Sequence, residues 1–537
     1  MHQPLVVTDF LDRARTHYTD EEAVVATTGE RFSYAEIGDR ADRFSALLQE
    51  RGMVKGDRIA VLDPNTHYHL EAAYGTLQMG GIHTPLNYRL TPQDYEYILN
   101  DADVGAIFAD HEYASKVEAV RDSIPTELFI TDDPAAVEGD WESFDGLLES
   151  SDGAYERPTL AEEDICTINY TSGTTGDPKG VCRTHRNETL HAYLTINHQQ
   201  ITDTDVYLWT LPMFHVNGWG HIYAITGCGG THVCTRGIDA ASIFESVRNE
   251  RVSYMCAAPT VLNMLLDHFE TEGGPIDDGQ DVRVATAGSA PPEATMRTLE
   301  EEFGWYLMHV YGLTETGPLI TTSDAPKLFA SDERDRFTMM KRQGLGFLGT
   351  EVRVVDDDGQ TIERDDSTIG EIVVRGNQVM ERYWNKPEET EKAFNEKLPG
   401  WFHTGDLATI DRNGMVSIQD RKKDIIVSGG ENISSIEVEN ALYDHDAVGS
   451  AAVIPAPSDS YGETVKAFVV PSSGDVDEPG VTPEELMAFT KDQLASYKRV
   501  RKLEFVDTLP TTATGKIQKF ELRSREWEDR DGMVGQG

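Results

Sequence analysis

The chain has 537 residues, more than the roughly 250–300 at which a single hydrophobic core stops growing, so at least two domains are expected. Its 93 acidic residues outnumber 47 Lys and Arg, and the formal net charge of −46 disfavours nucleic-acid and anionic-membrane partners. The five cysteines form no CxxC pair, so neither a zinc site nor a disulfide framework is indicated. No signal-like start or long apolar run occurs, and we expect a cytoplasmic protein.

Short apolar runs rich in β-branched residues alternate with helical patterns along the chain. The strand-like runs are RIAVLDP near residue 58, VGAIFAD near 104, ELFITD near 127, YLWTLPMF near 207 and VRVATAGS near 282. Between them apolar residues recur at spacings of three and four, as in Tyr34, Ile37 and Ala41, which predicts amphipathic helices. This alternation predicts an α/β fold in which helices cover β-sheets in several layers.

The pattern changes to short strands and helices near residue 420. We therefore predict a large multi-layered N-terminal domain over residues 1–419 and a smaller, mobile α+β domain over 420–537. Arg421, Lys422 and Lys423 interrupt an otherwise acidic sequence at this border. They indicate a hinge at 420–424, with a solvated charge cluster as the alternative.

Residues 170–180 read YTSGTTGDPKG and are the richest signal for chemistry. Glycines let the backbone approach a ligand closely, hydroxyl groups add hydrogen-bond donors, and Lys179 supplies a positive charge. The pattern predicts a polyphosphate cradle, although it is not a Walker A motif. A flexible linker is the alternative, which the direct continuation into VCRTHRN disfavours.

YTSGTTGDPKG resembles the AMP-binding signature of the adenylate-forming superfamily, which includes acyl-CoA synthetases, luciferases and adenylation domains of peptide synthetases. Further segments match that superfamily in order and spacing: AGSAPP (287–292), HVYGLTETGP (309–318), WFHTGDLA (401–408), DRKKDIIVSGGENISSIEVE (420–439) and LPTTATGKIQK (509–519). The resemblance covers nearly the whole chain. It implies an ATP-dependent carboxylic acid:coenzyme A ligase that forms an acyl-adenylate, then acyl-CoA, AMP and pyrophosphate.

The resemblance implies roles for residues at the phosphates. Those that would embrace the β- and γ-phosphates of ATP are Thr171, Ser172, Gly173, Thr174, Thr175, Gly176 and Lys179. Glu315 and the Thr171 hydroxyl would bind Mg²⁺, because a hard cation prefers oxygen ligands; a structural glutamate at a helix N-terminus is the alternative. Lys516 would be the lysine of adenylation.

The resemblance also implies residues for the rest of the nucleotide and for coenzyme A. Those that would line the adenine and acyl sites are Gly288, Ser289, Ala290, Tyr311 and Gly312, with Thr314 near the α-phosphate. Asp406 would accept hydrogen bonds from the ribose with help from Arg421, unless it is only a turn residue. Lys423 would mark the hinge, and Gly429 and Gly430 would leave room for the pantetheine arm.

The run LPMFHVNGWG (211–220) is similar to the equivalent run of fatty-acid ligases. By that resemblance His215 lines the acyl site and Trp219 gates it, with a core pair as the alternative. Asn432 and Val427 depart from the long-chain bacterial ligases, which favours short- or medium-chain fatty acids. The alternatives to this function are an aryl or other carboxylic acid:CoA ligase, a luciferase-type monooxygenase, a phosphate-loop NTPase and a non-catalytic binding protein. Whether the chain forms a homodimer stays open.

The acidic residues are spread along the chain, and we predict a salt-loving source organism. Repulsion within a chain of net charge −46 weakens when salt screens it. We expect the unfolding midpoint to rise between ~0.1 and ~2 M KCl, measured by thermal denaturation. A midpoint that falls or stays constant would refute this idea.

Overall fold

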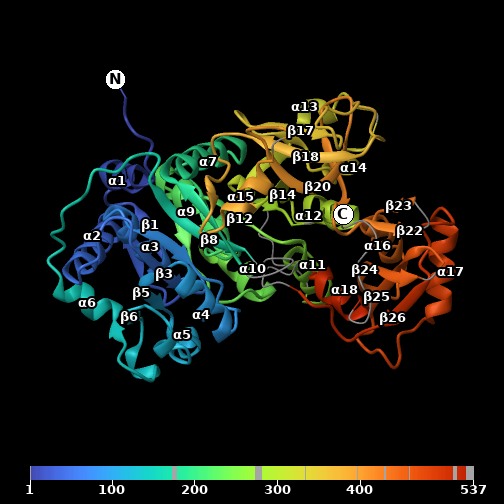
Figure 1. Cartoon of the computed structure of the whole chain (residues 1–537). Coiled ribbons are helices and arrows are strands. Elements are labelled where there is room, and N and C mark those ends of the chain that lie inside the picture. Colours follow the sequence, from blue (N-terminus) through green and yellow to red (C-terminus); the bar gives the residue numbers. More distant parts are fainter. Residues whose placement is uncertain are drawn as a thin grey trace. The chain divides into compact units, whose positions relative to one another are not determined.

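The structure is a computed structural model that describes residues 2–171, 178–272, 281–288, 290–332, 334–395, 397–428, 431–458, 460–511 and 517–527. The chain divides into two compact units (Figure 1). The first takes in most of the chain up to residue 402, and the second takes in 353–373 and the chain from 403 onward. The domain border and hinge that the sequence predicts near 420 stay predictions.

The first unit contains an eight-stranded sheet. In spatial order its strands are β19 (Arg382–Tyr383), β9 (Lys179–Thr184), β8 (Ile165–Thr171), β4 (Ile82–Pro85), β3 (Arg58–Leu62), β5 (Val104–Ala109), β6 (Leu128–Thr131) and β7 (Glu142–Ser143). From β8 to β7 neighbouring strands are parallel, whereas β9 is antiparallel to both β8 and β19.

Side chains of β3 show how both faces of this sheet are covered. Ile59 and Val61 pack in one core with α2 (Tyr34–Glu50) and α3 (His67–Gln78), whereas Ala60 and Leu62 pack in another with α4 (Pro92–Asp101) and α5 (His111–Glu118). Successive side chains of a strand point to opposite faces, so a strand covered on both sides is apolar throughout. This is why RIAVL reads as a continuous apolar run.

The first unit also contains a nine-stranded sheet. In spatial order its strands are β16 (Leu345–Gly346), β15 (Leu319–Thr322), β14 (Tyr306–Gly312), β13 (Arg283–Thr286), β12 (Tyr254–Cys256), β10 (Val206–Leu208), β11 (Thr231–Val233), β1 (Glu22–Val25) and β2 (Arg31–Ser33). The strands from β14 to β1 are parallel to their neighbours. Helices that follow its strands or pack with them are α1 (Thr8–His17), α7 (His185–His198), α9 (His221–Cys228), α10 (Ala240–Asn249), α11 (Pro259–Glu272) and α12 (Glu293–Glu301).

Helix α3 belongs to the packing of both sheets. Its Ala72 lies in the core beside β3, whereas Leu70, Tyr74 and Leu77 lie in the core that also contains residues of α1 and α9. A helix that is apolar around most of its circumference is buried between layers. The α/β class and the layered first unit that the sequence predicts are therefore confirmed.

The second unit mixes sheets and helices. One sheet comprises β17 (Glu351–Val355), β18 (Gly370–Arg375), β20 (Phe402–Ile410) and β21 (Val416–Arg421), whose first three strands also include residues of the first unit. The other comprises β23 (Glu431–Ile433), β22 (Ile426–Ser428), β25 (Gly462–Pro471), β24 (Val448–Ser458) and β26 (Lys502–Phe505). Its helices are α16 (Ser435–Tyr443), α17 (Pro483–Gln493) and α18 (Lys519–Trp527). Throughout the described ranges, every helix falls short of the length and apolar character that a bilayer crossing requires.

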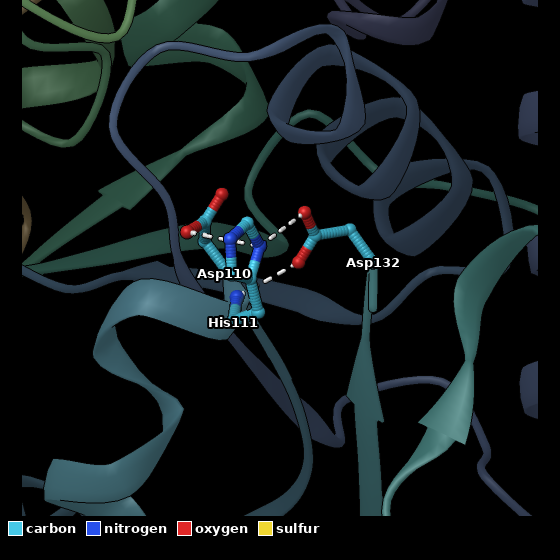
Figure 2. A group of neighbouring side chains, drawn as sticks. All are labelled: Asp110, His111 and Asp132. Atoms are coloured by element: carbon cyan, nitrogen blue, oxygen red, sulfur yellow. Dashed lines mark hydrogen bonds and ion pairs between the residues drawn. The ribbon is translucent and has the colours of Figure 1, made fainter. Parts of the chain in front are cut away.

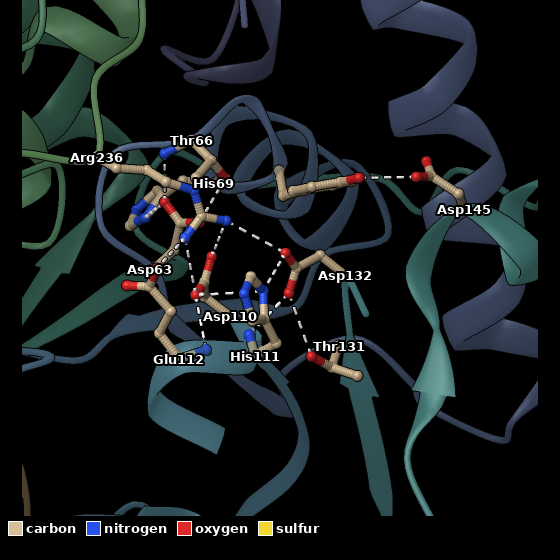
Figure 3. Close-up of polar contacts among 11 residues, drawn as sticks. Asp63, Thr66, His69, Asp110, His111, Glu112, Thr131, Asp132, Asp145 and Arg236 are labelled. Atoms are coloured by element: carbon tan, nitrogen blue, oxygen red, sulfur yellow. Dashed lines mark hydrogen bonds and ion pairs between the residues drawn. The ribbon is translucent and has the colours of Figure 1, made fainter. Parts of the chain in front are cut away.

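An acidic cluster lies where parallel strands of the eight-stranded sheet end. Asp110 follows β5 and Asp132 follows β6, and His111 Nδ1 lies 2.8 Å from Asp132 Oδ2 (Figure 2). Arg236, from the segment after β11 of the other sheet, reaches Asp110 at 2.6 Å and Asp132 at 3.3 Å (Figure 3). Arg236 thus links the segment after β11 of the nine-stranded sheet to the ends of β5 and β6 of the eight-stranded sheet.

We predict that Arg236→Leu destabilises the protein by about 3 kcal/mol, because it leaves the fully buried Asp110 without its charged partner. Burial raises the pKa of Asp110, so the folded state binds this proton more readily than the unfolded state does. Loss of the positive charge of Arg236 raises the pKa of Asp110 further. The loss of folding free energy in Arg236→Leu should therefore be smaller at pH 5 than at pH 8.

Urea unfolding at both pH values provides the measurement. Arg31→Leu is the matched control, because Arg31 pairs with Glu22 and Glu250 at the surface, where removal of an ion pair costs less than about 1 kcal/mol. Equal losses in the two variants would contradict the structural role of Arg236.

Candidate active site

The hairpin of β8 and β9 places two predicted phosphate residues opposite each other. Thr171 pairs with Lys179 across the antiparallel strands, and its hydroxyl donates to the Lys179 carbonyl at 3.4 Å. The predicted residues Ser172, Gly173, Thr174, Thr175 and Gly176 lie outside the described residues. The structure thus positions both ends of the predicted phosphate cradle.

Lys179 belongs to a cluster with Tyr383, Glu315 and Glu389, here called the lysine–glutamate cluster. Its ammonium contacts the Glu389 carboxylate of α15 (Pro387–Ala393) and lies 5.2 Å from the Tyr383 ring centroid. The Tyr383 hydroxyl donates to Glu315 Oε1 at 2.8 Å. Two of the predicted residues, Lys179 and Glu315, are therefore brought to the same aromatic ring.

Electrostatics within this cluster favour a charged Glu389 carboxylate and a neutral Tyr383 phenol. Hydrogen bonds from Lys179 and Lys392 lower the pKa of Glu389 to about 2. Burial and the neighbouring Glu315 carboxylate raise the pKa of Tyr383 well above its usual range. Tyr383 consequently stays a hydrogen-bond donor that orients one Glu315 oxygen, and a carboxylate has further lone pairs for a cation.

Several predicted residues follow the carboxyl ends of neighbouring parallel strands. Gly288 and Ala290 follow β13, Tyr311 and Gly312 end β14, and Thr314 and Glu315 begin the short 3₁₀ helix η3 (Thr314–Thr316). Ser289 lies outside the described residues. A side chain at Gly312 would collide with the backbone of Pro318, so the chain needs glycine there. Ligands of α/β sheets bind at this edge.

His215 and Trp219 lie in the segment after β10, a third parallel strand of the same sheet. Trp219 is 7% exposed and ends α8 (Val216–Trp219), which has left-handed backbone. His215 is half-buried directly before this turn. His215 and Trp219 therefore follow a strand end at the same sheet edge as Gly288, Gly312 and Glu315.

The second unit carries the remaining predicted residues. Asp406 of β20 lies opposite Arg421 of β21, and Arg421 Nε is 2.8 Å from Asp406 Oδ1. Asp406 is almost fully buried, and Lys423 follows two residues after Arg421. Gly429, Gly430 and Lys516 lie outside the described residues. Asp406 and Arg421 are thus brought together, as expected of residues that act on one group.

Sequence reasoning missed Tyr383 and Glu389. Glu389 contacts Lys179 across a separation of 210 residues, and Tyr383 reaches Glu315 across 68. The surrounding run ERYWNKPEET has aromatic and acidic residues but no spacing that predicts a ligand. Only the pairing of β19 with β9 brings them to the cluster.

The acidic cluster of Figures 2 and 3 is the one group of three His or carboxylate ligands within 4.8 Å of one another that the described residues form. It comprises Asp110, His111 and Asp132. Arg236 already places a positive charge against both carboxylates. We therefore attribute a structural role to this cluster.

Glycines and a carboxylate at parallel strand ends, with a lysine on a nearby antiparallel hairpin, are typical of α/β proteins that bind a phosphorylated ligand at a sheet edge. Comparison with known proteins narrows this class. A family model described as AMP-binding enzyme matches residues 10–384, and one described as AMP-binding enzyme C-terminal domain matches 437–516. The chain belongs to the AMP-binding enzyme family, which confirms the superfamily that the sequence predicts.

Relatives cover nearly the full chain. The 4-hydroxybutyrate–CoA ligase 2 of Metallosphaera sedula is 35% identical, over 96% of this chain and 93% of the relative. The probable acyl-activating enzyme 6 of Arabidopsis thaliana is 37% identical, over 97% and 96%. The solved structure of the anthranilate CoA ligase AuaEII with anthranoyl-AMP has a TM-score of 0.86 at 25% identity and 98% coverage of both chains.

We predict that Glu389→Gln lowers the Kd for ATP by about two- to fivefold at low salt, because the amide competes less with phosphate for the Lys179 ammonium. Calorimetric titration at about 0.05 and 1 M salt measures the effect, which should shrink as screening increases. Glu391→Gln, an exposed residue of the same helix, is the control for the change in net charge. Equal shifts in both variants would contradict a specific role of Glu389.

Proposed function

We propose that the chain is an ATP-dependent carboxylic acid:coenzyme A ligase. A carboxylate oxygen attacks the α-phosphorus of ATP, the bond to pyrophosphate breaks, and an acyl-adenylate forms. The sulfur of coenzyme A then attacks the acyl carbonyl carbon, and AMP leaves. The lysine–glutamate cluster at the sheet edge carries this proposal, since it joins the base of the phosphate cradle to Glu315.

The first half-reaction brings two anions together, so cationic neutralisation supplies much of its catalysis. Lys179 is suited to this role, because it begins β9 at one end of the predicted phosphate cradle and supplies a positive charge. Glu315 and Thr171 offer the hard oxygen donors that Mg²⁺ prefers, and they are the ligands that we assign to it. Bound Mg²⁺ would neutralise phosphate charge.

The second unit would contribute the ribose acceptor and the mobile groups. The buried Asp406 carboxylate with Arg421 fits ribose hydroxyls, which need an acceptor held in place. Lys516 is assigned to adenylation, and Gly429 and Gly430 to the pantetheine channel. Rotation about Lys423 between the half-reactions is the proposed use of the hinge.

The proposed acid is a short- or medium-chain fatty acid. The buried Trp219 fits a pocket closed by an aromatic ring, and the Metallosphaera relative is named for a four-carbon hydroxy acid. An aryl acid is the second candidate, which the anthranoyl-AMP complex of the solved neighbour favours. A luciferase-type monooxygenase would consume oxygen and emit light, whereas a ligase does neither.

A panel of carboxylates tests the proposal. Pyrophosphate release is measured with straight-chain acids of about two to twelve carbons and with benzoate, each with and without coenzyme A. We expect acid-dependent release, turnover that requires coenzyme A, and the highest kcat/KM for a short- or medium-chain acid. If no acid stimulates release, the proposed function is wrong.

We predict that Glu315→Gln raises the Mg²⁺ concentration for half-maximal activity about tenfold, because a neutral amide is a poorer ligand for a hard dication. Initial rates at saturating ATP across a magnesium titration measure this. Glu381→Gln, an exposed neighbour of β19, is the matched control and should behave as the unmodified protein. Unchanged magnesium dependence of Glu315→Gln would remove Glu315 from the metal site.

A further inference from the structure

The segment Val216–Gly220, here called the left-handed turn, has positive φ at five consecutive residues. The φ values are 43°, 46°, 55°, 54° and 77° from Val216 to Gly220, and ψ is 48° at Asn217 and 39° at Gly218. L-residues rarely take this conformation in a run, because their Cβ approaches the following carbonyl. A turn that includes Val and Trp therefore needs surroundings that hold it in place.

The side chain of Asn217 supplies such a restraint. Its Nδ2 donates to Glu188 Oε1 of α7 at 3.1 Å, and its Oδ1 accepts from Asn169 Nδ2 at 3.2 Å and Thr167 Oγ1 at 3.4 Å. Asn217 is fully buried, and both Asn169 and Thr167 belong to β8. Buried polar groups with well-placed partners specify one arrangement, because other arrangements would leave them unpaired.

The same network reaches the segment that carries Glu315. Arg183 of β9 lies 3.2 Å from Glu188 Oε1, and both side chains are fully buried. Arg183 Nη1 donates to the carbonyl of Gly317, two residues after Glu315. The left-handed turn is thus connected through Glu188 and Arg183 to the nucleotide side of the site.

Close packing fixes the glycines of the turn as well. A side chain at Gly218 would collide with the Trp209 ring, and one at Gly220 would approach His191 Nδ1 to 2.6 Å. His191 Nε2 in turn accepts from the backbone of Leu319 at 3.2 Å. Neither glycine position therefore has room for a side chain unless its neighbours move.

We propose that Asn217 is a positioning residue that sets selectivity for the acid substrate. It holds the turn that contains Trp219, and so keeps the indole in one position beside the strand ends. This inference rests on the proposed function. Lys179 and Glu315 lie outside the turn, so loss of the Asn217 amide should affect the acid more than ATP.

Asn217→Gly tests the role, because glycine accepts the left-handed backbone and removes the whole side chain with its amide. We expect the KM for the preferred acid to rise about tenfold, while the KM for ATP changes less than about twofold. The preference between the best acid and one that is two methylenes longer should weaken at least about threefold, since a mobile indole no longer limits the chain.

Ser45→Ala is the matched control. The Ser45 hydroxyl is buried and bonds the carbonyls of Ala41 and Gly75, so its loss removes a buried hydrogen bond between α2 and α3 without touching the turn. This variant should keep the acid preference of the unmodified protein. Equal effects of Asn217→Gly and Ser45→Ala, or equal rises in both KM values of Asn217→Gly, would overturn the proposal.

Hydrogen exchange gives a readout that does not depend on activity. Amides of the peptide around the turn should exchange at least about tenfold faster in Asn217→Gly than in the unmodified protein or in Ser45→Ala. Unchanged exchange there would show that Asn217 does not restrain the turn. Acid-dependent pyrophosphate release by the unmodified protein is measured first, because its absence refutes the proposed function and with it the selectivity role.

Discussion

Parallel strands present all their carboxyl ends at one edge of a sheet, and the candidate site depends on this constraint. The segments after β10, β13 and β14 carry Trp219, Gly288 and Glu315, which lie far apart in the sequence. Strands β8 and β9 bring Lys179 from the other sheet, and Tyr383 connects it to Glu315. The proposed site is therefore assembled from loops, while the buried strands supply rigidity.

Ion pairs to buried carboxylates restrain connections of the nine-stranded sheet. Arg183 with Glu188 restrains the left-handed turn and the segment after η3, and Arg236 with Asp110 restrains the connection after β11. Such pairs add little stability compared with apolar side chains packed in the same place, because the cost of desolvation offsets their attraction. Their value here is geometric, because a guanidinium has donors in fixed directions and joins elements that apolar contacts alone would orient less strictly.

The excess of acidic residues affects how the cationic groups of the proposed site attract anionic ligands. With a net charge of −46, the chain as a whole repels ATP and carboxylates. Under the proposed function Lys179 would act on phosphate at short range, where its ammonium contacts the Glu389 carboxylate. Because salt screens distant charges more than contacts, raised ionic strength would weaken the general repulsion and retain the local attraction.

The sequence by itself determined the α/β class, the helix from Tyr34, the strands at RIAVL and VGAIFA, and membership of the superfamily, because periodicity and contiguous motifs are local properties. It also led us to propose Lys179, Glu315, Asp406 and Arg421 as site residues, which stay predictions, and only the tertiary structure supplied their partners. Tyr383, Glu389 and Arg183 gave no local signal, since their roles depend on strand pairings and contacts across tens to hundreds of residues. The left-handed backbone at Val216 and Trp219 was likewise not predictable from the sequence, because both residue types disfavour it and its restraints, such as the hydrogen bond from Asn217 to Glu188, are tertiary contacts.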